Sequence, residues 1–486
     1  MMHACSSRTV LSRAACRPSR VVVVAAPRSR TLATATTAHP VVVGTTSSRS
    51  HKVVIVGAGA AGASVSHQLL RSGRYARGDI AVVDPAPWHH YQPGWTLVGG
   101  GLARKQDLRL RTADVLDPKL ALYDEAVRDF QPAESTVTLA ATGQTLRYEQ
   151  LVVCPGIHID YASIKGLPEA LADPGAPVST VYGYEGADKV FGTVEGLKKG
   201  RALFTQPKGL IKCAGAPQKV MWLALDYWKR AGRYRPGSGS GGGGGGGDEG
   251  EGVGVTFATA APAMFGVPKY SAALEALRVA RGVEGLFGHD LVEVDGDVAV
   301  FAREEADGIS TIRRRFDLLH AVPKMGPHAF VARSPLADAA TGLVDVDAAT
   351  LRHKRHGNVW ALGDAAGLPT AKTAAAVTAQ APVLVANLLA VAEQGRKEED
   401  EKEEEEGPLP ATYDGYTSCP LTTEYGKVLL AEFKYGGEPK ETFARLGVDQ
   451  AVPNRLFYHL KKDFFPWVYK KHMIKGTWGG PKGFLR

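Results

Sequence analysis

Residues 51–84, HKVVIVGAGAAGASVSHQLLRSGRYARGDIAVVD, constrain the fold more than any other stretch of this chain. The apolar run 53–56 predicts a buried parallel strand, which leads into Gly57-Ala58-Gly59-Ala60-Ala61-Gly62 and a helical stretch. A second apolar run, 80–83, stops at Asp84. Strand, glycine turn, helix, strand and acid in this order form the fingerprint of a dinucleotide-binding β–α–β unit. The sequence therefore predicts an α/β protein built on such a unit.

Each glycine of this turn has its own task. Gly57 makes the tight turn, Gly59 lets the backbone approach a pyrophosphate, and Gly62 lets helix and strand pack closely. The helix N-terminus offers free N–H groups and a partial positive charge to the phosphates. Asp84 would accept a hydrogen bond from a ribose hydroxyl. The alternative is a glycine-rich turn without a ligand, but the flanking strands and the acid favour nucleotide binding.

The basic residues are concentrated at the two ends of the chain. The protein has 486 residues, enough for two or three domains, and a formal net charge of +8. Residues 1–52 carry seven Arg, one Lys and no acid, and residues 453–486 carry eight basic residues against Asp463, so the residues between them sum to −7. A mildly acidic body without a basic stripe argues against nucleic-acid binding.

Residues 1–50 have the composition of a targeting segment, rich in Arg, Ser, Thr and Ala. We predict a disordered transit peptide that directs the chain to the mitochondrion, with the chloroplast as the less favoured alternative. Three cysteines follow this segment, too few for a disulfide framework. The uncharged stretch 373–392 is long enough to cross a membrane, but its polar residues and many alanines favour a buried helix.

Two insertions and an unusual tail interrupt the globular pattern. Residues 236–252, nearly all glycine, predict a flexible surface loop, and residues 393–408 predict a solvated acidic insertion. Residues 453–475 interleave aromatic and aliphatic residues with Lys and Arg, and Pro466 should split them into two short helices. Such a segment suits a membrane interface. The alternative is an amphipathic helix packed on the body.

Cys213 is the most informative cysteine. It precedes Pro217 and the apolar helical stretch 220–227, and proline suits the first turn of a helix. A thiol just before a helix N-terminus, flanked by Lys212 and with Lys219 as a second candidate neighbour, should have a lowered pKa and more thiolate near neutral pH. Taken alone, a buried inert cysteine explains the position equally well.

The same stretch, 209–219, lacks a motif that a nicotinamide-dependent flavoprotein would show there. In a two-domain flavoprotein that uses NADH, the first strand of the second domain leads into another GxGxxG. This chain has Lys-Cys-Ala-Gly-Ala-Pro instead. A thiol therefore takes the place of the nicotinamide site.

From about residue 51 to the C-terminus the chain resembles the sulfide:quinone oxidoreductases of the mitochondrial type, flavoproteins with two dinucleotide-binding domains. The stretches that carry the resemblance are 90–99 (HYQPGWTLVG), 212–219 (KCAGAPQK), 369–376 (PTAKTAAA), 413–421 (YDGYTSCPL) and 478–481 (WGGP). The fold it implies has two Rossmann-like domains and a C-terminal amphipathic segment at the membrane. The domains it implies are a discontinuous FAD-binding domain (51–165 and 321–410), a second Rossmann-like domain (166–320) and a segment with a redox cysteine and a membrane anchor (411–486).

The resemblance implies FAD as the cofactor, no metal, and Cys213 and Cys419 as the redox pair. The implied FAD contacts are Gly57, Gly59, Ala60, Ala61, Gly62, Asp84, Gln92, Val127, Asp364 and Lys372. Asp364 would bind the ribityl or pyrophosphate side, and Lys372 would stabilise the anionic reduced ring. The chain departs from the family at Cys154, where relatives have a small residue, and we assign that thiol no role.

The resemblance also implies a reaction. Hydrosulfide would attack the bridge between Cys213 and Cys419, leaving one cysteine as a persulfide and the other as a thiolate. Electrons would pass through FAD to ubiquinone in the mitochondrial inner membrane, where the tail attaches the protein peripherally. Glutathione or sulfite would remove the outer sulfur. Two alternatives are a type II NADH:quinone oxidoreductase, which the missing second glycine motif disfavours, and a non-catalytic FAD-bearing interaction protein.

Overall fold

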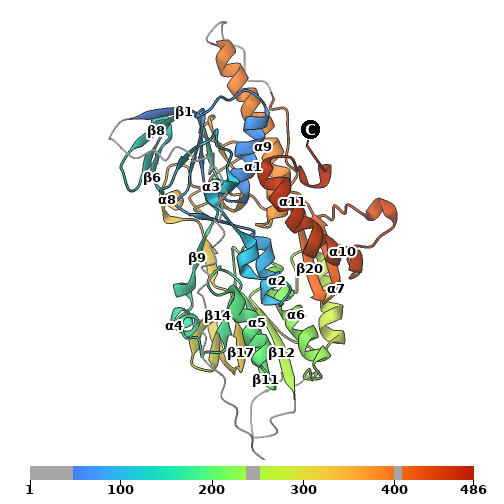
Figure 1. The fold of residues 1–486 in the computed structure, drawn as a ribbon. Coiled ribbons are helices and arrows are strands. Elements are labelled where there is room, and N and C mark those ends of the chain that lie inside the picture. The colour runs from blue at the N-terminus through green and yellow to red at the C-terminus, as the bar shows by residue number, and fades with distance from the viewer. Residues whose placement is uncertain (1–47, 237–251, 399–407, 486) are drawn as a thin grey trace, which may run out of the picture. The chain divides into compact units, whose positions relative to one another are not determined.

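The computed structural model describes residues 48–236, 252–398 and 408–485. Apart from their edges, the predicted transit peptide (1–50), the glycine-rich insertion (236–252) and the acidic insertion (393–408) lie outside the described residues. The predicted α/β fold with two Rossmann-like sheets is confirmed, and the two sheets are labelled in Figure 1. The exact domain limits stay a prediction.

The first sheet grows from the predicted dinucleotide unit. β1 (Arg49–Val56), α1 (Ala60–Arg71) and β2 (Ile80–Val83) follow one another, with Val53 opposite Ile80 in parallel register. The residues of β2 are all buried, as in parallel sheets covered on both faces. The strand order is β5 (Ala121–Tyr123), β2, β1, β8 (Thr145–Val153), β7 (Thr136–Leu139) and β6 (Val127–Gln131), with β19 (Val359–Ala361) paired to β8.

The second sheet is wholly parallel and carries the cysteine turn. Its order is β10 (Val178–Ser179), β17 (Leu318–His320), β11 (Gly200–Gln206), β12 (Val253–Thr259) and β13 (Glu284–Phe287). The helices that accompany it are α5 (Ala187–Gly196), α6 (Ala216–Arg230) and α7 (Pro268–Ala280). A long apolar strand next to an amphipathic helix is repeated here, which explains why this region follows the same architecture as the first sheet.

Smaller elements connect and extend the two sheets. An antiparallel pair, β9 (His158–Asp160) with β18 (Lys324–Gly326), lies where the chain passes between them, as Figure 1 shows for β9. The other short elements are β3 (Trp88–His90), α2 (Trp95–Gly99), β4 (Arg109–Arg111), α3 (Thr112–Val115), α4 (Leu167–Ala172), β14 (Asp290–Asp295), β15 (Val298–Glu305), β16 (Gly308–Arg315) and α8 (Ala329–Ala332).

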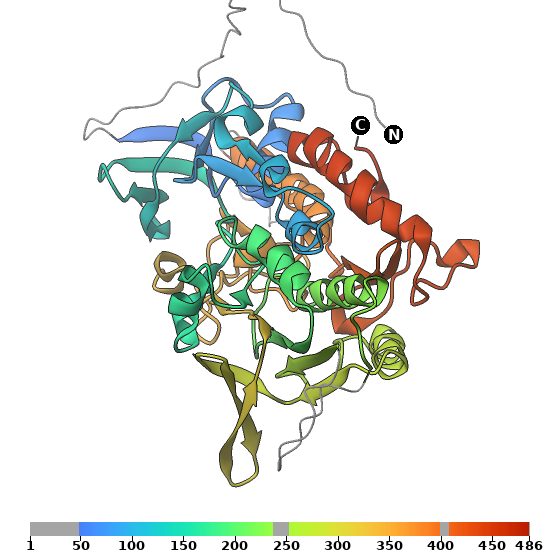
Figure 2. The same ribbon diagram turned by 60° about the horizontal axis from the view of Figure 1, so that its bottom comes forward.

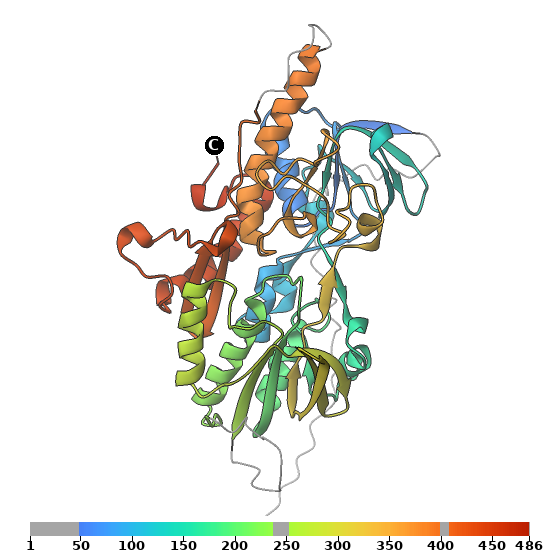
Figure 3. The same ribbon diagram turned by 180° about the vertical axis from the view of Figure 1, so that it is seen from behind.

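The alanine-rich stretch forms α9 (Ala374–Glu398), seen in orange in Figure 3. Among the described residues, Ala374–Gln394 is the one helical stretch long and apolar enough to span a membrane, with a hydropathy of 1.8 over the window. The core helix of a soluble protein can have the same length and composition, and 56% of this apolar stretch is buried. Its first half packs against α1 and the C-terminal hairpin, as the predicted buried helix would.

The C-terminal region is a hairpin followed by one helical rod. β20 (Thr417–Glu424) pairs with β21 (Lys427–Phe433), and the hairpin packs on α6 and α9. The prediction that Pro466 splits the tail is wrong: α10 (Arg455–His459), the π-helical turn η8 (Leu460–Phe464) and α11 (Phe465–Lys471) run on continuously, as Figure 2 shows. Proline lacks an N–H, and the wider π turn just before it accommodates that loss without ending the helix.

Candidate active site

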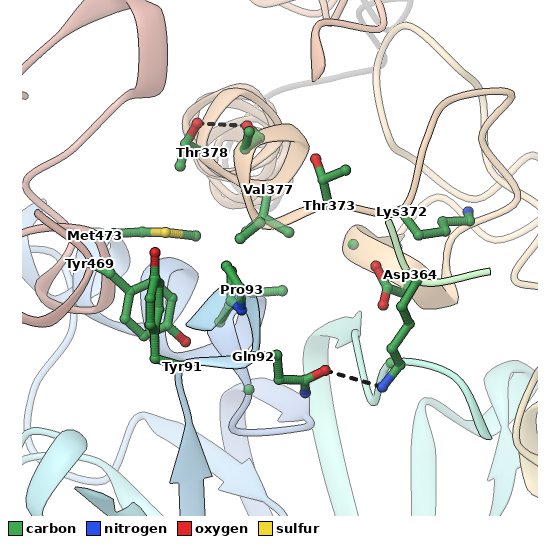
Figure 4. A pocket seen from close by; sticks show the side chains of 18 of the residues that line it. Tyr91, Gln92, Pro93, Asp364, Lys372, Thr373, Val377, Thr378, Tyr469 and Met473 are labelled. Carbon is green, nitrogen blue, oxygen red and sulfur yellow. Dashed lines mark hydrogen bonds between the residues drawn. The ribbon is translucent and has the colours of Figure 1, made fainter. Parts of the chain in front are cut away.

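A cavity of about 910 Å³ lies where the first sheet, the cysteine turn and the tail helix meet. Its wall includes the turn after β1, the end of β2, the loop around Gln92, the first turns of α9 and the tail. Figure 4 shows Val377 in the first turn of α9 and Thr373 just before that helix, above Tyr91, Gln92 and Pro93, with Asp364 and Lys372 on one side and Tyr469 and Met473 on the other. The cavity is large enough for a dinucleotide, and residues that follow strands of both sheets line it.

The glycine turn is built as its sequence predicts. Gly57 has φ +106°, and a Cβ there would lie 2.5 Å from the carbonyl oxygen of Cys154. A Cβ on Gly62 would lie 1.8 Å from the Gly57 oxygen, so Gly62 allows the helix to approach the turn. A Cβ on Gly59 would meet nothing within 4 Å. The space over Gly59 is therefore open to a ligand, while the other two glycines serve the fold itself.

Asp84 closes this turn from the end of β2. Its carboxylate accepts hydrogen bonds from the Ala58 N–H at 2.5 Å and from the Ala86 N–H at 2.8 Å. Burial raises the pKa of Asp84, and these two backbone bonds oppose that shift. Asp84 thus stabilises the turn in addition to bordering the cavity where a ribose would lie.

Nine of the ten predicted FAD contacts border the cavity. Gly62 is the exception, because it lies behind the turn against Gly57 and the thiol of Cys154. The nine are Gly57, Gly59, Ala60, Ala61, Asp84, Gln92, Val127, Asp364 and Lys372. Their roles in binding stay a prediction, but segments as far apart as residues 57 and 372 line one space.

The charged groups of this wall face one another. Burial raises the pKa of Asp364, against the attraction of Lys212 and Lys372. Burial lowers the pKa of Lys372 to about 8, and Asp364 opposes that shift. The ammonium of Lys372 donates to the Ala366 carbonyl at 2.6 Å, and that of Lys212 donates to Gln92 at 3.3 Å. Lys372 could therefore respond to a negative charge that develops in the cavity.

These residues fit FAD. The helix α1 begins at Ala60 without a side-chain cap, and its first residues border the cavity, so a pyrophosphate bound there can accept from its first N–H groups. Apolar walls such as Val127 and Val377 suit flat rings, and Lys372 lies in the same cavity as a candidate partner for a reduced, anionic ring.

The structure brings the two predicted redox cysteines together. The sulfur atoms of Cys213 and Cys419 are 3.4 Å apart, and both are free thiols. Cys213 borders the cavity, whereas Cys419, on β20, lies behind it and is 2% exposed. The Cys213 N–H donates to the Lys372 carbonyl at 2.9 Å, and Cys213 has φ +54°. A left-handed backbone is uncommon outside glycine and asparagine, so this turn holds the thiol in a strained but defined position.

The surroundings of the two thiols favour a thiolate on Cys213 over one on Cys419. A hydrogen bond from Cys419 and the nearby Lys219 ammonium lower the pKa of Cys213 well below its ordinary value, against burial. The same hydrogen bond and burial raise the pKa of Cys419. The Lys219 ammonium lies 3.2 Å from the Cys213 sulfur. Of the two lysines considered from the sequence, Lys219 is therefore the partner, because Lys212 donates to Gln92 instead.

The third thiol, Cys154, lies under the glycine turn. Its sulfur donates to the Gly57 carbonyl at 3.7 Å, and burial raises its pKa. A buried thiol with a raised pKa is a poor nucleophile. Cys154 therefore fills space beneath the turn.

Sequence reasoning missed several side chains that complete this region. The Nδ1–H of His89 donates to the Ala58 carbonyl at 2.9 Å, and its Nε2 shares a hydrogen bond with the Tyr469 hydroxyl at 2.8 Å, so His89 links the glycine turn to the tail helix. Lys461 and Glu432 are buried and border the cavity. In the sequence, the signal that could have identified Lys461 as a buried residue is a charge on the apolar face of the predicted tail helix.

The tail helix has one buried and one exposed apolar face. Phe457, Val468 and Tyr469 are buried against the body. Leu456 and Trp467 are exposed, at 54% and 48%. The tail is thus packed on the body and also presents large apolar side chains outward, and its attachment to a membrane stays a prediction.

Comparisons with known proteins agree with one another. Residues 51–199 match the family model of the pyridine nucleotide-disulphide oxidoreductases. The chain is 43% identical over 457 residues to the mitochondrial sulfide:quinone oxidoreductase of Schizosaccharomyces pombe, which covers 90% of this chain and 93% of that protein. It is 41% identical over 430 residues to the one of Dictyostelium discoideum, with 88% and 87% covered. A solved sulfide:quinone oxidoreductase, from Aquifex aeolicus, has a TM-score of 0.64 at 15% identity over 86% of this chain and 91% of that chain, which shows a shared fold.

Proposed function

Because this chain belongs to the mitochondrial sulfide:quinone oxidoreductases, we propose that it oxidises sulfide through a persulfide on the pair Cys213 and Cys419. It is an FAD-dependent mitochondrial enzyme that transfers electrons from sulfide to a quinone. The distance of 3.4 Å between the two sulfur atoms supports the proposal most directly, because a disulfide needs only a small approach from there. The thiol turn between β11 and α6 occupies the place of a second glycine motif.

In the resting enzyme the pair is a disulfide, and hydrosulfide attacks the sulfur of Cys419. The Cys213–Cys419 bond breaks, Cys419 keeps the incoming sulfur as a persulfide, and Cys213 leaves as a thiolate. Lys219 stabilises that thiolate, since a leaving thiol of low pKa departs faster. Removal of the outer sulfur by a nucleophile leaves Cys419 as a thiolate. When the two cysteines form their disulfide again they release an electron pair, which FAD, when bound, would accept and pass to the quinone.

The finer assignments rest on the same site. We propose ubiquinone as the electron acceptor and glutathione or sulfite as the acceptor of the outer sulfur. Leu456 and Trp467 would enter the bilayer interface of the inner membrane, which would place a lipid-borne quinone next to the tail that walls the cavity. Replacing both by glutamate should reduce the protein's sedimentation with cardiolipin-containing vesicles by at least tenfold, because two exposed apolar side chains are lost to the interface. Unchanged sedimentation would contradict peripheral attachment through this face.

Anaerobic titration of the FAD-loaded protein tests the function. Sulfide should bleach the flavin absorbance, and decylubiquinone should restore it, while NADH should leave it unchanged. Cys213→Ser and Cys419→Ser should keep FAD but lose bleaching by sulfide, because neither variant can form the disulfide. A Cys213→Ser protein that bleaches at the wild-type rate would refute the pairing.

A further inference from the structure

The left-handed turn that presents Cys213 is held by three segments that are distant from it in the sequence. Lys212, the residue before the thiol, is held at both of its backbone groups. Its N–H donates to the sulfur of Met325 at 3.2 Å, and its carbonyl accepts from the Tyr182 hydroxyl at 3.0 Å. The next N–H, that of Cys213, donates to the Lys372 carbonyl at 2.9 Å. Three successive backbone groups ahead of the sulfur are therefore fixed from outside the turn.

These bonds from outside matter because the conformation of the turn is unfavourable for cysteine. Cys213 has φ +54°, and a residue with a side chain keeps such a value only where its surroundings determine it. Within the turn, the Ala216 N–H donates to the Cys213 carbonyl at 2.8 Å, which fixes the peptide after the thiol. Rotation about φ turns the side chain relative to the peptide before it. The bonds to that earlier peptide therefore decide where the sulfur lies.

Tyr182 is the anchor that lies beside both thiols. It is buried and borders the cavity. Burial raises its pKa well above the ordinary value, and Cys213 and Cys419 raise it further. The hydroxyl therefore stays protonated while the thiols titrate, and it remains a donor to the Lys212 carbonyl throughout. The sulfur of Met325 is only a weak acceptor, so its bond to the same peptide contributes less.

The position of Tyr182 is itself fixed by neighbouring groups. The Val181 N–H donates to Nε2 of His320 at 3.3 Å, the Tyr182 N–H donates to the Thr180 hydroxyl at 3.3 Å, and the Tyr182 carbonyl accepts from the Tyr161 hydroxyl. Burial lowers the pKa of His320 to about 3, so its ring is neutral and can accept. The chain just after β10 is thus a rigid support for the tyrosine ring.

We propose that Tyr182, assisted by Met325, is a positioning residue for the redox pair: it holds the peptide before Cys213 and so keeps the thiol in place. This inference rests on the proposed function and deepens it. Two contacts define that place, 3.4 Å from the Cys213 sulfur to the Cys419 sulfur and 3.2 Å to the Lys219 ammonium. The first permits the disulfide, and the second stabilises the leaving thiolate. Tyr182 keeps its own proton in this role.

The first test measures the thiolate at Cys213 and needs neither sulfide nor turnover. In the reduced wild-type protein the hydrogen bond from Cys419, and after it Lys219, lower the pKa of Cys213. Tyr182→Phe removes the hydroxyl and keeps the ring, so the sulfur should leave these contacts and its pKa should rise toward about 8.5. Peptide mass spectrometry gives the iodoacetamide rates at Cys213. The ratio of the rate at about pH 6.5 to that at about pH 9 should fall about tenfold.

Tyr435→Phe is the matched control. The Tyr435 hydroxyl also donates to a backbone carbonyl, that of Ala348, at 2.8 Å, so the variant loses the same kind of bond elsewhere. Its ratio of rates should equal that of wild type. A merely structural role for Tyr182 would loosen the turn and change the rates at both pH values together, which leaves the ratio unchanged.

The second test measures the reaction itself. At saturating sulfide, stopped-flow bleaching of the FAD-loaded enzyme should be about tenfold slower in Tyr182→Phe, because displaced reacting groups react more slowly. Reoxidation by decylubiquinone should match wild type, since that step does not use the thiol turn. Met325→Leu keeps the apolar volume and removes the weaker anchor, so it should change both the bleaching rate and the alkylation ratio in the same direction by about twofold to threefold.

The outcomes separate the two proposals. If sulfide does not bleach the wild-type enzyme, the proposed function is wrong, and the alkylation ratio still reports on Tyr182. If Tyr182→Phe matches Tyr435→Phe in alkylation ratio and in bleaching rate, the positioning role is wrong. Should Tyr182→Phe fail to fold or to hold FAD, Met325→Leu decides the question: a shifted ratio supports the inference, and a ratio equal to that of wild type overturns it.

Discussion

Two turns of this protein occupy equivalent places in the two sheets but present different chemical groups to the cavity. β1 leads through residues 57–59 into α1, and β11 leads through residues 207–215 into α6. Each joins a buried strand of a parallel sheet to the helix that follows it. The first presents bare backbone to the cavity, and the second presents a thiol and a lysine. The same supersecondary unit is thus proposed to bind a phosphate in one sheet and to hold a reactive sulfur atom in the other.

Each turn depends on a glycine that permits a close approach. At the first turn, Gly62 of α1 leaves room for the backbone oxygen of Gly57, which lies five residues earlier in the chain. In the second, a Cβ on Gly215 would lie 2.6 Å from the sulfur of Cys419, which belongs to a different strand. The first contact is local and the second is long-range. The structural role of a glycine in such a unit therefore depends on the residue that it contacts in the folded protein.

Gly57→Ala should have the largest effect, because the positive φ of Gly57 and the atoms packed against it both disfavour a side chain. Its φ of +106° and the carbonyl oxygen 2.5 Å from a Cβ predict a loss of roughly 3 kcal/mol or more in the free energy of unfolding. FAD should be lost with it. Thermal unfolding and the flavin content of the purified protein measure this. Full FAD occupancy in the variant would contradict the assigned role of the turn.

Gly215→Ala should leave the first turn intact and damage the second. Gly215 has φ −87°, which alanine adopts freely, so the effect comes from the contacts that the Cβ would make with the Cys419 sulfur at 2.6 Å and with Leu421 at 2.7 Å, both on β20. We expect FAD to stay bound and bleaching by sulfide to slow about a hundredfold, since misplaced reacting groups cost that order of rate. Gly192→Ala on α5 is the control, because a Cβ there meets nothing within 4 Å. Equal bleaching rates in the two variants would show that Gly215 is not needed for the approach of the thiols.

Gly59→Ala separates ligand binding from folding in the first turn. A Cβ at this position has open space around it, so the unfolding free energy of the FAD-free protein should change by no more than about 0.5 kcal/mol. The FAD dissociation constant should rise about thirtyfold, equivalent to about 2 kcal/mol, because the Cβ enters the space of the pyrophosphate. Unfolding of the FAD-free protein measures the first quantity, and fluorescence titration of the same protein with FAD measures the dissociation constant. Unchanged affinity would place the pyrophosphate elsewhere.

Lys219→Met should have the smallest effect of the four and tests the charge in the second turn. The hydrogen bond from Cys419, and after it Lys219, lower the pKa of Cys213, so the reduced wild-type enzyme should keep its thiolate well below the ordinary thiol pKa of about 8.5. Its alkylation by iodoacetamide should therefore vary little between about pH 6 and 8. In the variant the pKa rises, and the rate should fall as the pH drops, to about a tenth of the wild-type rate near pH 7. Parallel pH profiles would exclude Lys219 as the stabilising charge.

Contiguous features of the molecule were predictable from the sequence. The order β1, glycine turn, α1, β2 and Asp84 lies within one stretch, and so does Cys213 ahead of Pro217 and α6. Apolar periodicity, glycine and proline act over a few residues, and these units form wherever the rest of the chain allows. The resemblance to a known family added Cys419 and the FAD contacts that are distant in the chain. It indicated which residues take part in the site, but not which residues contact one another.

The contacts that complete the site were decided only by tertiary structure. Cys419 reaches Cys213 because the hairpin register and the small Gly215 let two faces meet, and Lys461 borders the same cavity from the π turn of the tail, which packs on the body. The bond between His89 and Tyr469 spans 380 residues. Such pairings depend on how whole faces pack, and no local pattern encodes the partner of a face. The sequence by itself determined the two strand–turn–helix units, and the packing of the hairpin and tail against them decided which side chains share the cavity.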